Sequence, residues 1–373
     1  MTRSRGSGAL VLGVVVACTP TAAPAALVKV YPGQSIQAAV DAASPGDTVL
    51  VMPGDYVETH GGTAAVRITK RLKLLARSRP PDVKVRILPG PGQTDGILVE
   101  PATAGDPDVD RVRIRGFTVE GFPNNGIWLR HVNRFRIERN ESIDNLENGI
   151  WPTLSANGVV RKNVSYGSKD SALWVEASEN VRVIANELHH SPTGLEITVS
   201  KNVVAQKNDV HDNSIGIGLY HPSAASLPPL GGDGDWDIVG NRVYDNNQPN
   251  DAPPGSMSAE LPPGGGILVL GVDDVDLRKN QVHGNDFFGI AMIDYCLAVA
   301  GTDFDCGMNP PEVEPSPDDN RVTHNAATDN GAAPPPGPFA PFASDILFLG
   351  GTNDCFSGNT AGLTIPATLP ACS

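Results

Sequence analysis

The stretch "KNVSYGSKDSALWVEASENVRVIANELHH", residues 162–190, contains one full unit of the repeat that decides the fold. An Asn stands near each end, at Asn163 and Asn186, and the two are 23 residues apart. The same position recurs from Asn140 to Asn208 in steps of 23, 23 and 22 residues, and later members are Asn241, Asn280, Asn325 and Asn359. Self-similarity at such a fixed period is typical of stacked repeats.

Each unit also carries a Gly-Ile-like pair and three short runs in which apolar and polar residues alternate. The pairs begin at Gly126, Gly149, Ala172, Gly194, Gly216, Gly266 and Gly289. Such runs, separated by Asn, Gly and Asp turns, are typical of short β-strands. Stacking the units into a column buries their Val, Ile and Leu side chains and pairs each strand with the next unit at ~4.8 Å. The recurrent Asn then predicts a hydrogen-bonded ladder inside the column.

A helical cap is predicted at the start of this column, in "PGQSIQAAVDAASPGDTVLVMPGDYVE" (32–58). Ser35 is a suitable N-cap for a short helix, and Ile36, Val40 and Ala43 lie on one face of it. A cap of this kind covers the open end of a β-column, whose edge would otherwise recruit other strands.

The Asn and Gly-Ile repeats, together with this cap, resemble the right-handed parallel β-helix (pectate-lyase-like) superfamily. They are most similar to its bacterial exported proteins with tandem parallel β-helix (PbH1) repeats. The resemblance implies an all-β chain in which residues 27–373 form one right-handed three-stranded solenoid with Pro/Gly-rich insertions. Because this fold hosts lyases, hydrolases, epimerases and binding proteins, it does not choose among those functions.

Charge and the N-terminal segment bear on partners and location. The net charge is −14, and the chain from Asp209 onward has 22 acidic against 4 basic residues, which argues against nucleic-acid binding.

Residues 1–26 read as an export signal, with Arg3 and Arg5 before the apolar run "ALVLGVVVA", which is too short to span a membrane. We expect a monomer in the periplasm, in the outer membrane as a lipoprotein, or at the cell surface.

Within that signal, "VVAC" (15–18) resembles a lipobox and predicts lipidation of Cys18, which would be the chain's only link to a membrane. The alternative is cleavage after "TAAPAA" in an ordinary signal peptide. Removing Cys18 leaves an even set of four cysteines, for which three pairings are open. The simplest is local, with disulfides Cys296–Cys306 and Cys355–Cys372.

Three of the four tryptophans occupy one position of the repeat: Trp128, Trp151 and Trp174. If their apolar neighbours point inward, the three indoles point outward along one face. The same alternation adds Glu176, Glu196 and Tyr220 to that face, and Arg130 at its start. An aromatic row beside carboxylates suits a sugar chain, because sugar C–H groups stack on rings while carboxylates bind hydroxyls. The alternative is an aromatic ladder that only stiffens the sheet.

Three insertions flank the Gly-Ile strand, at residues 221–236, 248–265 and 296–319. Rigid loops on a rigid scaffold often carry function, so we expect them to wall a cleft. Its expected floor comprises Glu196, Tyr220, His221, Asp294 and Tyr295. The candidate catalytic residues are Glu176, Glu196, His221 and Asp294, with His221 as the preferred acid or base and the two glutamates as a hydrolase pair.

Two other polar patterns are expected to be structural. His189, His211 and His283 share one repeat position with Tyr166 and Tyr244, and this interchange argues against a metal site. Separately, Asp233, Asp235 and Asp237 in "GGDGDWD" resemble the start of a calcium loop but lack its later Gly and Glu. We therefore expect no cofactor, with calcium at these three residues as the weaker alternative.

Together these features predict an exported protein that binds, and in one reading processes, an extracellular or cell-envelope polysaccharide. As an enzyme it would be a polysaccharide lyase, a glycoside hydrolase or an epimerase. The alternatives are a non-catalytic carbohydrate-binding protein and a structural or adhesive solenoid with a protein partner. The sequence lacks the "DPH" of alginate epimerases and the "GHG" and "RIK" of polygalacturonases. The residues therefore leave open whether the protein is an enzyme.

Overall fold

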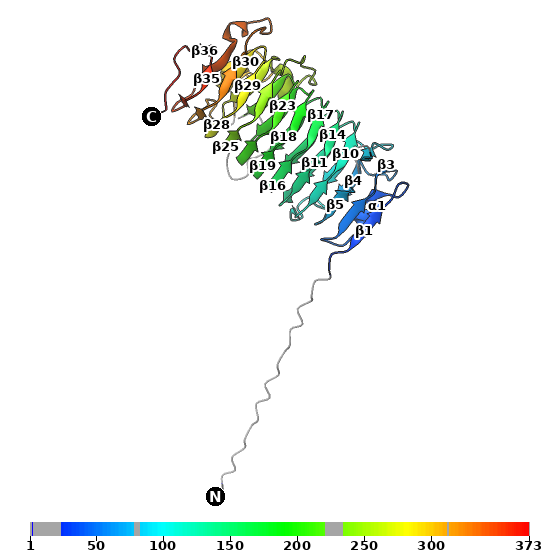
Figure 1. Ribbon diagram of the computed structural model, residues 1–373. Coiled ribbons are helices and arrows are strands. Elements are labelled where there is room, and N and C mark those ends of the chain that lie inside the picture. Colours follow the sequence, from blue (N-terminus) through cyan, green and yellow to red (C-terminus); the bar gives the residue numbers. More distant parts are fainter. Residues whose placement is uncertain (1, 3–23, 78–82, 221–233, 312, 373) are drawn as a thin grey trace.

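The computed structural model describes residues 2, 24–77, 83–220, 234–311 and 313–372. These residues wind into an elongated column, along which the chain runs in order from β1 to β36 (Figure 1). Each turn of the column, here called a coil, adds strands to three parallel sheets. This confirms the predicted single three-stranded parallel β-helix. In the described part of the chain, no helix is both long and apolar enough to cross a membrane.

The three sheets are named A, B and C. Sheet A contains β1 (Leu27–Val30), β2 (Thr48–Val51), β5 (Lys73–Ala76), β9 (Arg113–Arg115), β13 (Arg136–Glu138), β16 (Ala156–Arg161), β19 (Glu179–Ile184), β22 (Lys201–Gln206), β25 (Gly234–Val239), β28 (Val275–Arg278), β31 (Arg321–Thr323) and β34 (Cys355–Ser357), with β8 (Val109–Asp110) and β12 (Val132–Asn133) beside them.

Sheet B contains β3 (Gly54–Val57), β6 (Val85–Leu88), β10 (Phe117–Glu120), β14 (Glu141–Ile143), β17 (Val164–Tyr166), β20 (Glu187–His189), β23 (Asp209–His211), β26 (Arg242–Tyr244), β29 (Gln281–His283), β32 (Ala326–Thr328) and β35 (Thr360–Ala361). Sheet C contains β4 (Ala64–Ile68), β7 (Asp95–Val99), β11 (Ile127–Arg130), β15 (Ile150–Thr153), β18 (Ser171–Glu176), β21 (Thr193–Thr198), β24 (Ile215–Tyr220), β27 (Gly265–Leu270), β30 (Phe288–Ile293), β33 (Ser344–Leu349) and β36 (Thr364–Ile365).

The core is a set of aliphatic ladders that run along the column. In sheet C, Ile127 pairs with Ile150, which pairs with Leu173, and the ladder continues through Leu195 to Ile217. All five side chains are fully buried. Because each strand alternates, their sequence neighbours point out of the column. Burial of the inward set therefore fixes which side chains form the outer surface.

The corners between sheets combine backbone strain with buried polar ladders. Lys162 and Ala185 have φ of 53°, and each precedes a ladder Asn. That left-handed conformation costs about 1–2 kcal/mol for a residue other than Gly. The ladder offsets this cost: Asn163 N and Nδ2 both donate to Asn186 Oδ1, at 3.0 and 2.9 Å, and Asn163 Nδ2 also donates to Ile137 O. The predicted Asn ladder is confirmed.

The His/Tyr position of the repeat forms a stack on the outside of sheet B. Tyr166, His189, His211, Tyr244 and His283 overlie one another with ring centroids 4.6, 5.1, 5.0 and 5.3 Å apart. Burial, followed by the neighbouring His211 and His190, lowers the pKa of His189 to about 4. A row of mainly neutral rings fits the structural role that we expected for these histidines.

The helical cap is as predicted. Helix α1 (Ile36–Ala42) follows Ser35, whose side chain accepts from Ala38 N, and Ile36 and Val40 are buried. The Ser35 hydroxyl and the Ile36 backbone N–H both donate to Glu58, which holds the helix against the first coils.

The first predicted insertion, 221–236, lies mostly outside the described residues. The other two, together with a segment before β33, cover the outer face of sheet C over the later coils. They carry α2 (Met257–Glu260), α3 (Tyr295–Ala298) and the 3-10 helix η1 (Ala340–Phe342). Side chains from these segments pack on the sheet in what we call the outer apolar cluster: Ile215, Tyr220, Leu261, Leu268, Leu270, Phe287, Phe288, Ala291, Tyr295, Val299 and Leu347. The insertions thus lie on the sheet rather than standing beside it as the walls of a cleft.

Both locally paired disulfides are present. Cys296–Cys306 closes the start of the insertion after β30, and Cys355–Cys372 joins β34 to the last described residues. Each bridge staples a segment that has few coils to pack against.

The Asn ladder predicts a sharp stability difference between two adjacent residues. Asn280 donates to Ile238 O and Asn325 Oδ1 and accepts from Asn241 N and Nδ2, all at 2.8–3.0 Å. Asn280→Ala leaves several of these buried groups unpaired and should lower the free energy of unfolding by about 3 kcal/mol. The exposed neighbour Gln281 provides the control, and Gln281→Ala should change it by less than about 0.5 kcal/mol. Urea titration of both variants measures this, and equal midpoints would contradict a stabilising ladder.

Candidate functional site

The three tryptophans form a continuous stack on the outer face of sheet C. Trp128 lies over Trp151 with ring centroids 4.8 Å apart and planes 5° apart, and Trp151 lies over Trp174 at 5.2 Å and 6°. All three are half-buried, whereas the flanking Ile127 and Leu129 are fully buried. The outward row that the alternation predicts is therefore present.

The stack changes how these rings can meet a ligand. Coils repeat at strand spacing, so identical side chains on successive coils overlie face to face. Both faces of Trp151 lie against a neighbouring indole, and the ring is left with its edge toward solvent. Trp151 therefore has no free face on which a sugar could stack. The row instead presents the edges of its stacked indoles to solvent.

A second outward row, two residues further along each strand, anchors two of the indoles, whereas Trp128 Nε1 has no described hydrogen-bond partner. Trp151 Nε1 donates to Glu176 Oε2 at 3.2 Å, and Trp174 Nε1 donates to Thr198 Oγ1 at 2.9 Å. Glu176 Oε2 also accepts from Thr153 Oγ1 at 3.1 Å. Thr153, Glu176 and Thr198 follow one another in register, so Glu176 takes a position that its neighbours fill with Thr.

Glu176 is only 5% exposed. Burial raises the pKa of Glu176 to about 7, although the Thr153 and Trp151 hydrogen bonds act in the opposite direction. A carboxyl group in this state keeps its proton up to near-neutral pH. Such a group can act as a proton donor to a reacting oxygen.

Glu196 continues the tryptophan row, because it pairs with Trp174 in the next coil. It is also 5% exposed, and Ser171 Oγ donates to its Oε2 at 2.5 Å. Burial first, and then the nearby Asp170 charge, raise the pKa of Glu196 well above its ordinary value. A charged Glu196 is therefore strongly disfavoured while these neighbours cover it.

Asp170 completes the group, which we call the carboxyl cluster: Asp170, Glu176 and Glu196. Ser258 Oγ of α2 donates to Asp170 Oδ1 at 2.8 Å, and the adjacent Lys169 forms an ion pair with Asp251 of the same insertion. Burial raises the pKa of Asp170. Sequence reasoning missed Asp170, because it stands in a turn and is brought into the site by an insertion some 88 residues away. The one sequence feature that could have pointed to Asp170 is its position directly before β18, the strand that carries Trp174.

Tyr220 does not lie at the surface as predicted. Its side chain is fully buried within the outer apolar cluster and folds over Gly218, where an added Cβ would lie 2.0 Å from Tyr220 Oη. Gly218 thus leaves room for the ring beside Glu196. Burial, followed by the Glu196 charge, raises the pKa of Tyr220 well above its ordinary value. This buried phenol closes one side of the carboxyl cluster and is not an exposed contact.

Asp294 and Tyr295 are not brought to the carboxyl cluster, because they directly follow strand β30, which is three coils beyond β21. Asp294 caps α3 by accepting from Leu297 N at 3.0 Å, and it accepts from Ser316 Oγ at 3.0 Å. Tyr295 is buried in the outer apolar cluster, where it packs rather than binds. His221, the preferred acid or base, lies outside the described residues.

Calcium at Asp233, Asp235 and Asp237 was the weaker alternative, and the structure describes two of these three residues. Asp235 and Asp237 lie within strand β25, on sheet A. They face Lys201 at 3.9 Å and Arg278 at 3.0 Å, so their neighbours are basic side chains. Alternation along a strand, rather than a loop, explains their spacing. Asp233 and Cys18 lie outside the described residues.

Arg130 stands at the other end of the second outward row, in register with Thr153 and so two coils before Glu176. It is exposed and forms no ion pair with any described residue. It lines a polar surface cavity together with Arg67, Glu100 and the segment 101–106. The outer face of sheet C therefore runs from a cationic end, across the tryptophans, to the carboxyl cluster.

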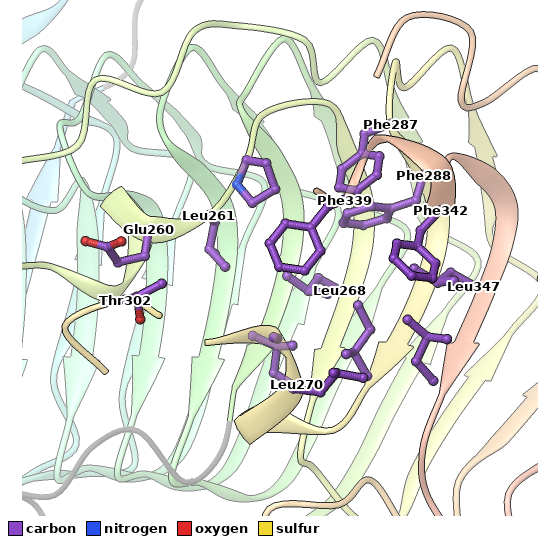
Figure 2. Close-up of a pocket in the computed structure, with 15 residues that line it drawn as sticks. Glu260, Leu261, Leu268, Leu270, Phe287, Phe288, Thr302, Phe339, Phe342 and Leu347 are labelled. Carbon is purple, nitrogen blue, oxygen red and sulfur yellow. The ribbon is translucent and has the colours of Figure 1, made fainter. Parts of the chain in front are cut away.

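A separate apolar pocket of about 100 Å³ lies over β27, β30 and β33 (Figure 2). Leu268, Phe288 and Leu347 from the sheet face Leu261 and Phe342 from the insertions. Glu260 and Thr302 are its polar lining residues, and no member of the carboxyl cluster borders it. The pocket is a gap in the outer apolar cluster and not the place where acid–base groups converge.

Comparison with solved structures agrees with the architecture. The A-module of mannuronan C-5 epimerase AlgE4 from Azotobacter vinelandii is 18% identical with a TM-score of 0.64, over 87% of this chain and 82% of that chain. The catalytic unit of a GH87 α-1,3-glucanase from Streptomyces thermodiastaticus is 16% identical with a TM-score of 0.57, over 92% of this chain and 65% of that chain. At these identities the likeness concerns the fold alone.

Comparison by sequence gives the family. No curated protein matches the chain. The model of the "Right handed beta helix region" family matches residues 95–228 and 125–304, which together are more than half of the chain. The matched part contains the tryptophan stack and the carboxyl cluster. The chain therefore belongs to the right-handed β-helix family.

Proposed function

We propose that this protein is exported and that it binds and hydrolyses a polysaccharide on the outer face of sheet C. One observation carries the proposal: the half-exposed tryptophan row runs directly into a cluster of carboxyl groups whose pKa values are raised. Exposed aromatic rows commonly mark interaction sites, and raised carboxyl pKa values commonly mark acid–base sites. In this chain a hydrogen bond from Trp151 to Glu176 joins the tryptophan row to the carboxyl cluster.

The fold neighbours support the choice of ligand class. By their names, one acts on mannuronan and the other on α-1,3-glucan. Arg130 would bind an anionic substituent of such a chain. It lies two coils before Glu176, or ~10 Å along the column, which is about the length of two sugar units. A chain lying along the column axis would contact Arg130, the tryptophan edges and Glu176 in turn.

The carboxyl cluster favours glycosidic-bond hydrolysis over elimination or epimerisation. Hydrolysis needs one carboxyl group that donates a proton and a second that acts as base or nucleophile. Glu176 would be the donor, and Glu196, on the next coil, would be the second group once the covering insertion opens and lets its carboxyl ionise. Elimination and epimerisation instead need a cation beside the uronate at the reacting carbon. The exposed cation of this face that has no described ion-pair partner, Arg130, is two coils away from the cluster, and Lys169, beside Asp170, is paired with Asp251.

A non-catalytic carbohydrate-binding protein is the second candidate, and the burial of the cluster favours it. Glu196 is 5% exposed, and Tyr220 is fully buried. Part of the α2 insertion is tied to Asp170 through Ser258. Hydrolysis would require that insertion to open, whereas binding at the tryptophan edges and Arg130 would not.

Export is supported by the two disulfides, because such bridges persist in oxidising compartments. We further propose that the mature chain begins at a lipidated Cys18, on the basis of "VVAC". The lipid anchor would hold the column at the cell envelope, close to a polysaccharide.

The raised pKa of Glu176 predicts how stability depends on pH. The folded pKa of about 7 exceeds the ordinary 4.5, so the folded state favours the protonated form. Its stabilisation is complete below about pH 4.5 and is lost as pH rises through 7. Glu176→Gln keeps an acceptor for Trp151 and cannot ionise. It should match wild type at pH 4.5 and exceed it at pH 8 by up to about 3 kcal/mol.

Urea titrations at both pH values measure this difference. Exposed Asp303, whose side chain has no described ion pair, provides the control, and Asp303→Asn should shift stability similarly at both pH values. A Glu176→Gln variant that loses stability equally at pH 4.5 and pH 8 would show that the carboxyl is ionised in the folded protein.

Activity on a polysaccharide panel separates the two candidate functions. The panel includes mannuronan and α-1,3-glucan and is assayed for glycan binding, for new reducing ends and for unsaturated uronates. We expect new reducing ends without unsaturated products. Glu176→Gln and Glu196→Gln should each lower that rate by about 10²–10⁴-fold while binding persists. Arg130→Ala should weaken binding of an anionic chain.

Binding without any product would leave the non-catalytic candidate. Lack of binding to every glycan would contradict both candidates. Glu187→Gln, on sheet B, serves as the matched control and should leave rate and binding unchanged.

Lipidation at Cys18 predicts a defined mass. The mature protein should begin at residue 18 and carry acyl chains, and Cys18→Ser should release it from the membrane fraction. Intact-mass spectrometry checks this, and an unmodified N-terminus beyond residue 18 would refute the anchor.

A further inference from the structure

Sheet A carries a concentration of positive charge that the site on sheet C does not use. It lies on the half of sheet A next to sheet B, and at the corner between them, over the six coils from β5 to β22 (Figure 1). The chain segments there are 73–77, 113–116, 136–139, 159–162, 182–185 and 204–207. They contain one acidic residue, Glu138, and ten basic residues, which we call the basic face: Lys73, Arg77, Arg113, Arg115, Arg136, Arg139, Arg161, Lys162, Arg182 and Lys207.

Two rows of cations run along this face. The strand row, at one register position of sheet A, holds Lys73, Arg113, Arg136 and, two coils later, Arg182. The corner row holds Arg139, Lys162 and Lys207, each directly before a ladder Asn. Because coils repeat at strand spacing, neighbouring cations within a row are ~4.8 Å apart or a small multiple of that distance.

Most of these cations have no counter-charge within the protein. Arg113 and Arg161 both pair with the buried Glu138 that lies between them. The other eight form no ion pair with any residue that the structure describes. Six of those eight are exposed: Lys73, Arg136, Arg139, Lys162, Arg182 and Lys207. The face is therefore positively charged on balance, in a chain whose net charge is −14.

Acidic residues nearby are occupied elsewhere. On the neighbouring strands of sheet B, the acidic residues have partners on that sheet or beside it, in the contacts Glu141–Lys84, Asp209–Arg242 and Glu187–His211. On sheet A beyond β22, Asp237 and Asp276 both face Arg278. Like charges held this close repel one another, so bound anions stabilise the face.

The corner row also uses a backbone conformation that its side chains do not favour. φ is 55° at Arg139, 53° at Lys162 and 55° at Lys207. Gly adopts this left-handed conformation without strain, and the same corner holds Gly116 and Gly240 on other coils. The turn alone would therefore be served better by Gly. Long cationic side chains at these positions point to a role for their charge.

We propose that the basic face binds a linear polysaccharide with a carboxylate on each sugar, a polyuronate. The evidence is charge complementarity and spacing. One coil, ~4.8 Å, is about the length of one sugar unit, so successive carboxylates can meet cations on successive coils. The arginines can bind carboxylates through two parallel hydrogen bonds. The six coils span ~24 Å, which is room for about five sugar units.

Nucleic acid fits this face less well. The phosphates of each DNA strand repeat at ~3.4 Å along the helix, which does not match the coils. Single-stranded nucleic acids are held by stacking of bases on aromatic side chains. The outward positions of sheet A from β5 to β22 hold no aromatic residue. The basic face is also separate from the outer face of sheet C, so this inference does not rest on the proposed hydrolysis.

The test is calorimetric titration of the full mature chain with polymannuronate at about 50 and about 300 mM NaCl, with dextran as the neutral probe and duplex DNA of equal total charge as the other polyanion. We expect polymannuronate to bind at low salt, at least about tenfold more weakly at high salt, and more tightly than the DNA. Dextran should show no salt-dependent binding. Absence of polymannuronate binding at low salt, or tighter binding of DNA, would overturn the proposal.

A matched pair of double variants locates the binding. The site variant combines Lys162→Gln with Arg182→Gln, and the control combines Lys279→Gln with Arg321→Gln. The control residues are exposed, have no described ion pair, and occupy the same corner and strand rows beyond the basic face. We expect the site variant to bind polymannuronate about tenfold more weakly at low salt and the control less than about twofold. Equal losses would show that net charge, and not this face, sets the affinity.

Two further measurements separate this proposal from its alternatives. Glu176→Gln, which should stop the proposed hydrolysis, should leave the salt-dependent binding intact. Loss of hydrolysis with intact binding would thus contradict the proposed function alone, and hydrolysis without salt-dependent binding would contradict the basic face alone. Sedimentation of the chain at low salt tests whether the acidic half of a second copy is the partner. Salt-sensitive self-association without polymannuronate binding would overturn the proposal in favour of that partner.

Discussion

Hydrogen bonding between coils at the corners is the interaction on which the rest of this structure depends. To turn from one sheet to the next, the chain places residues such as Ala177 and Val199 in the left-handed region, with φ of 42° and 47°. Each is followed by a buried polar residue, and Ser178 N donates to Ser200 Oγ at 3.0 Å. These bonds satisfy the buried backbone where no strand partner exists. They also force every coil to repeat the path of the previous one.

That repetition makes the outer surface periodic. Equivalent side chains on successive coils overlie at strand spacing, which is why three tryptophans form one stack and five His and Tyr rings form another. The period is broken at two positions of this surface. Glu176 replaces Thr in one row, and Glu196 replaces Trp in the other. Each replacement places a carboxyl group against residues that exclude water, and burial raises its pKa.

The insertions determine which part of the outer face of sheet C stays exposed to solvent. The α2 insertion returns to coil β18, where Ser258 binds Asp170, and so it closes one side of the carboxyl cluster. Over the later coils the insertions bury the outer apolar cluster, and the strongly acidic part of the chain lies there too. The N-terminal coils keep an exposed Arg130 beside the tryptophans. The outer face of sheet C therefore changes from cationic to aromatic to acidic to apolar along the column.

The sequence by itself determined the column, the outward row and the cap. The step of 23, 23 and 22 residues predicted the Asn ladder, alternation around Trp128 predicted its direction, and Ser35 predicted the start of α1. These features follow from contacts that recur at a fixed spacing along the chain, so a local pattern reveals them. The two local disulfides were the simplest of three open pairings, and their short separations made them so.

Only the tertiary structure decided the rest. It placed Asp170 in the cluster and buried Tyr220 over Gly218. These relations depend on where irregular insertions pack, and an insertion has no period from which its path can be read. Repeating contacts are encoded once per coil, whereas each of these contacts occurs once in the molecule.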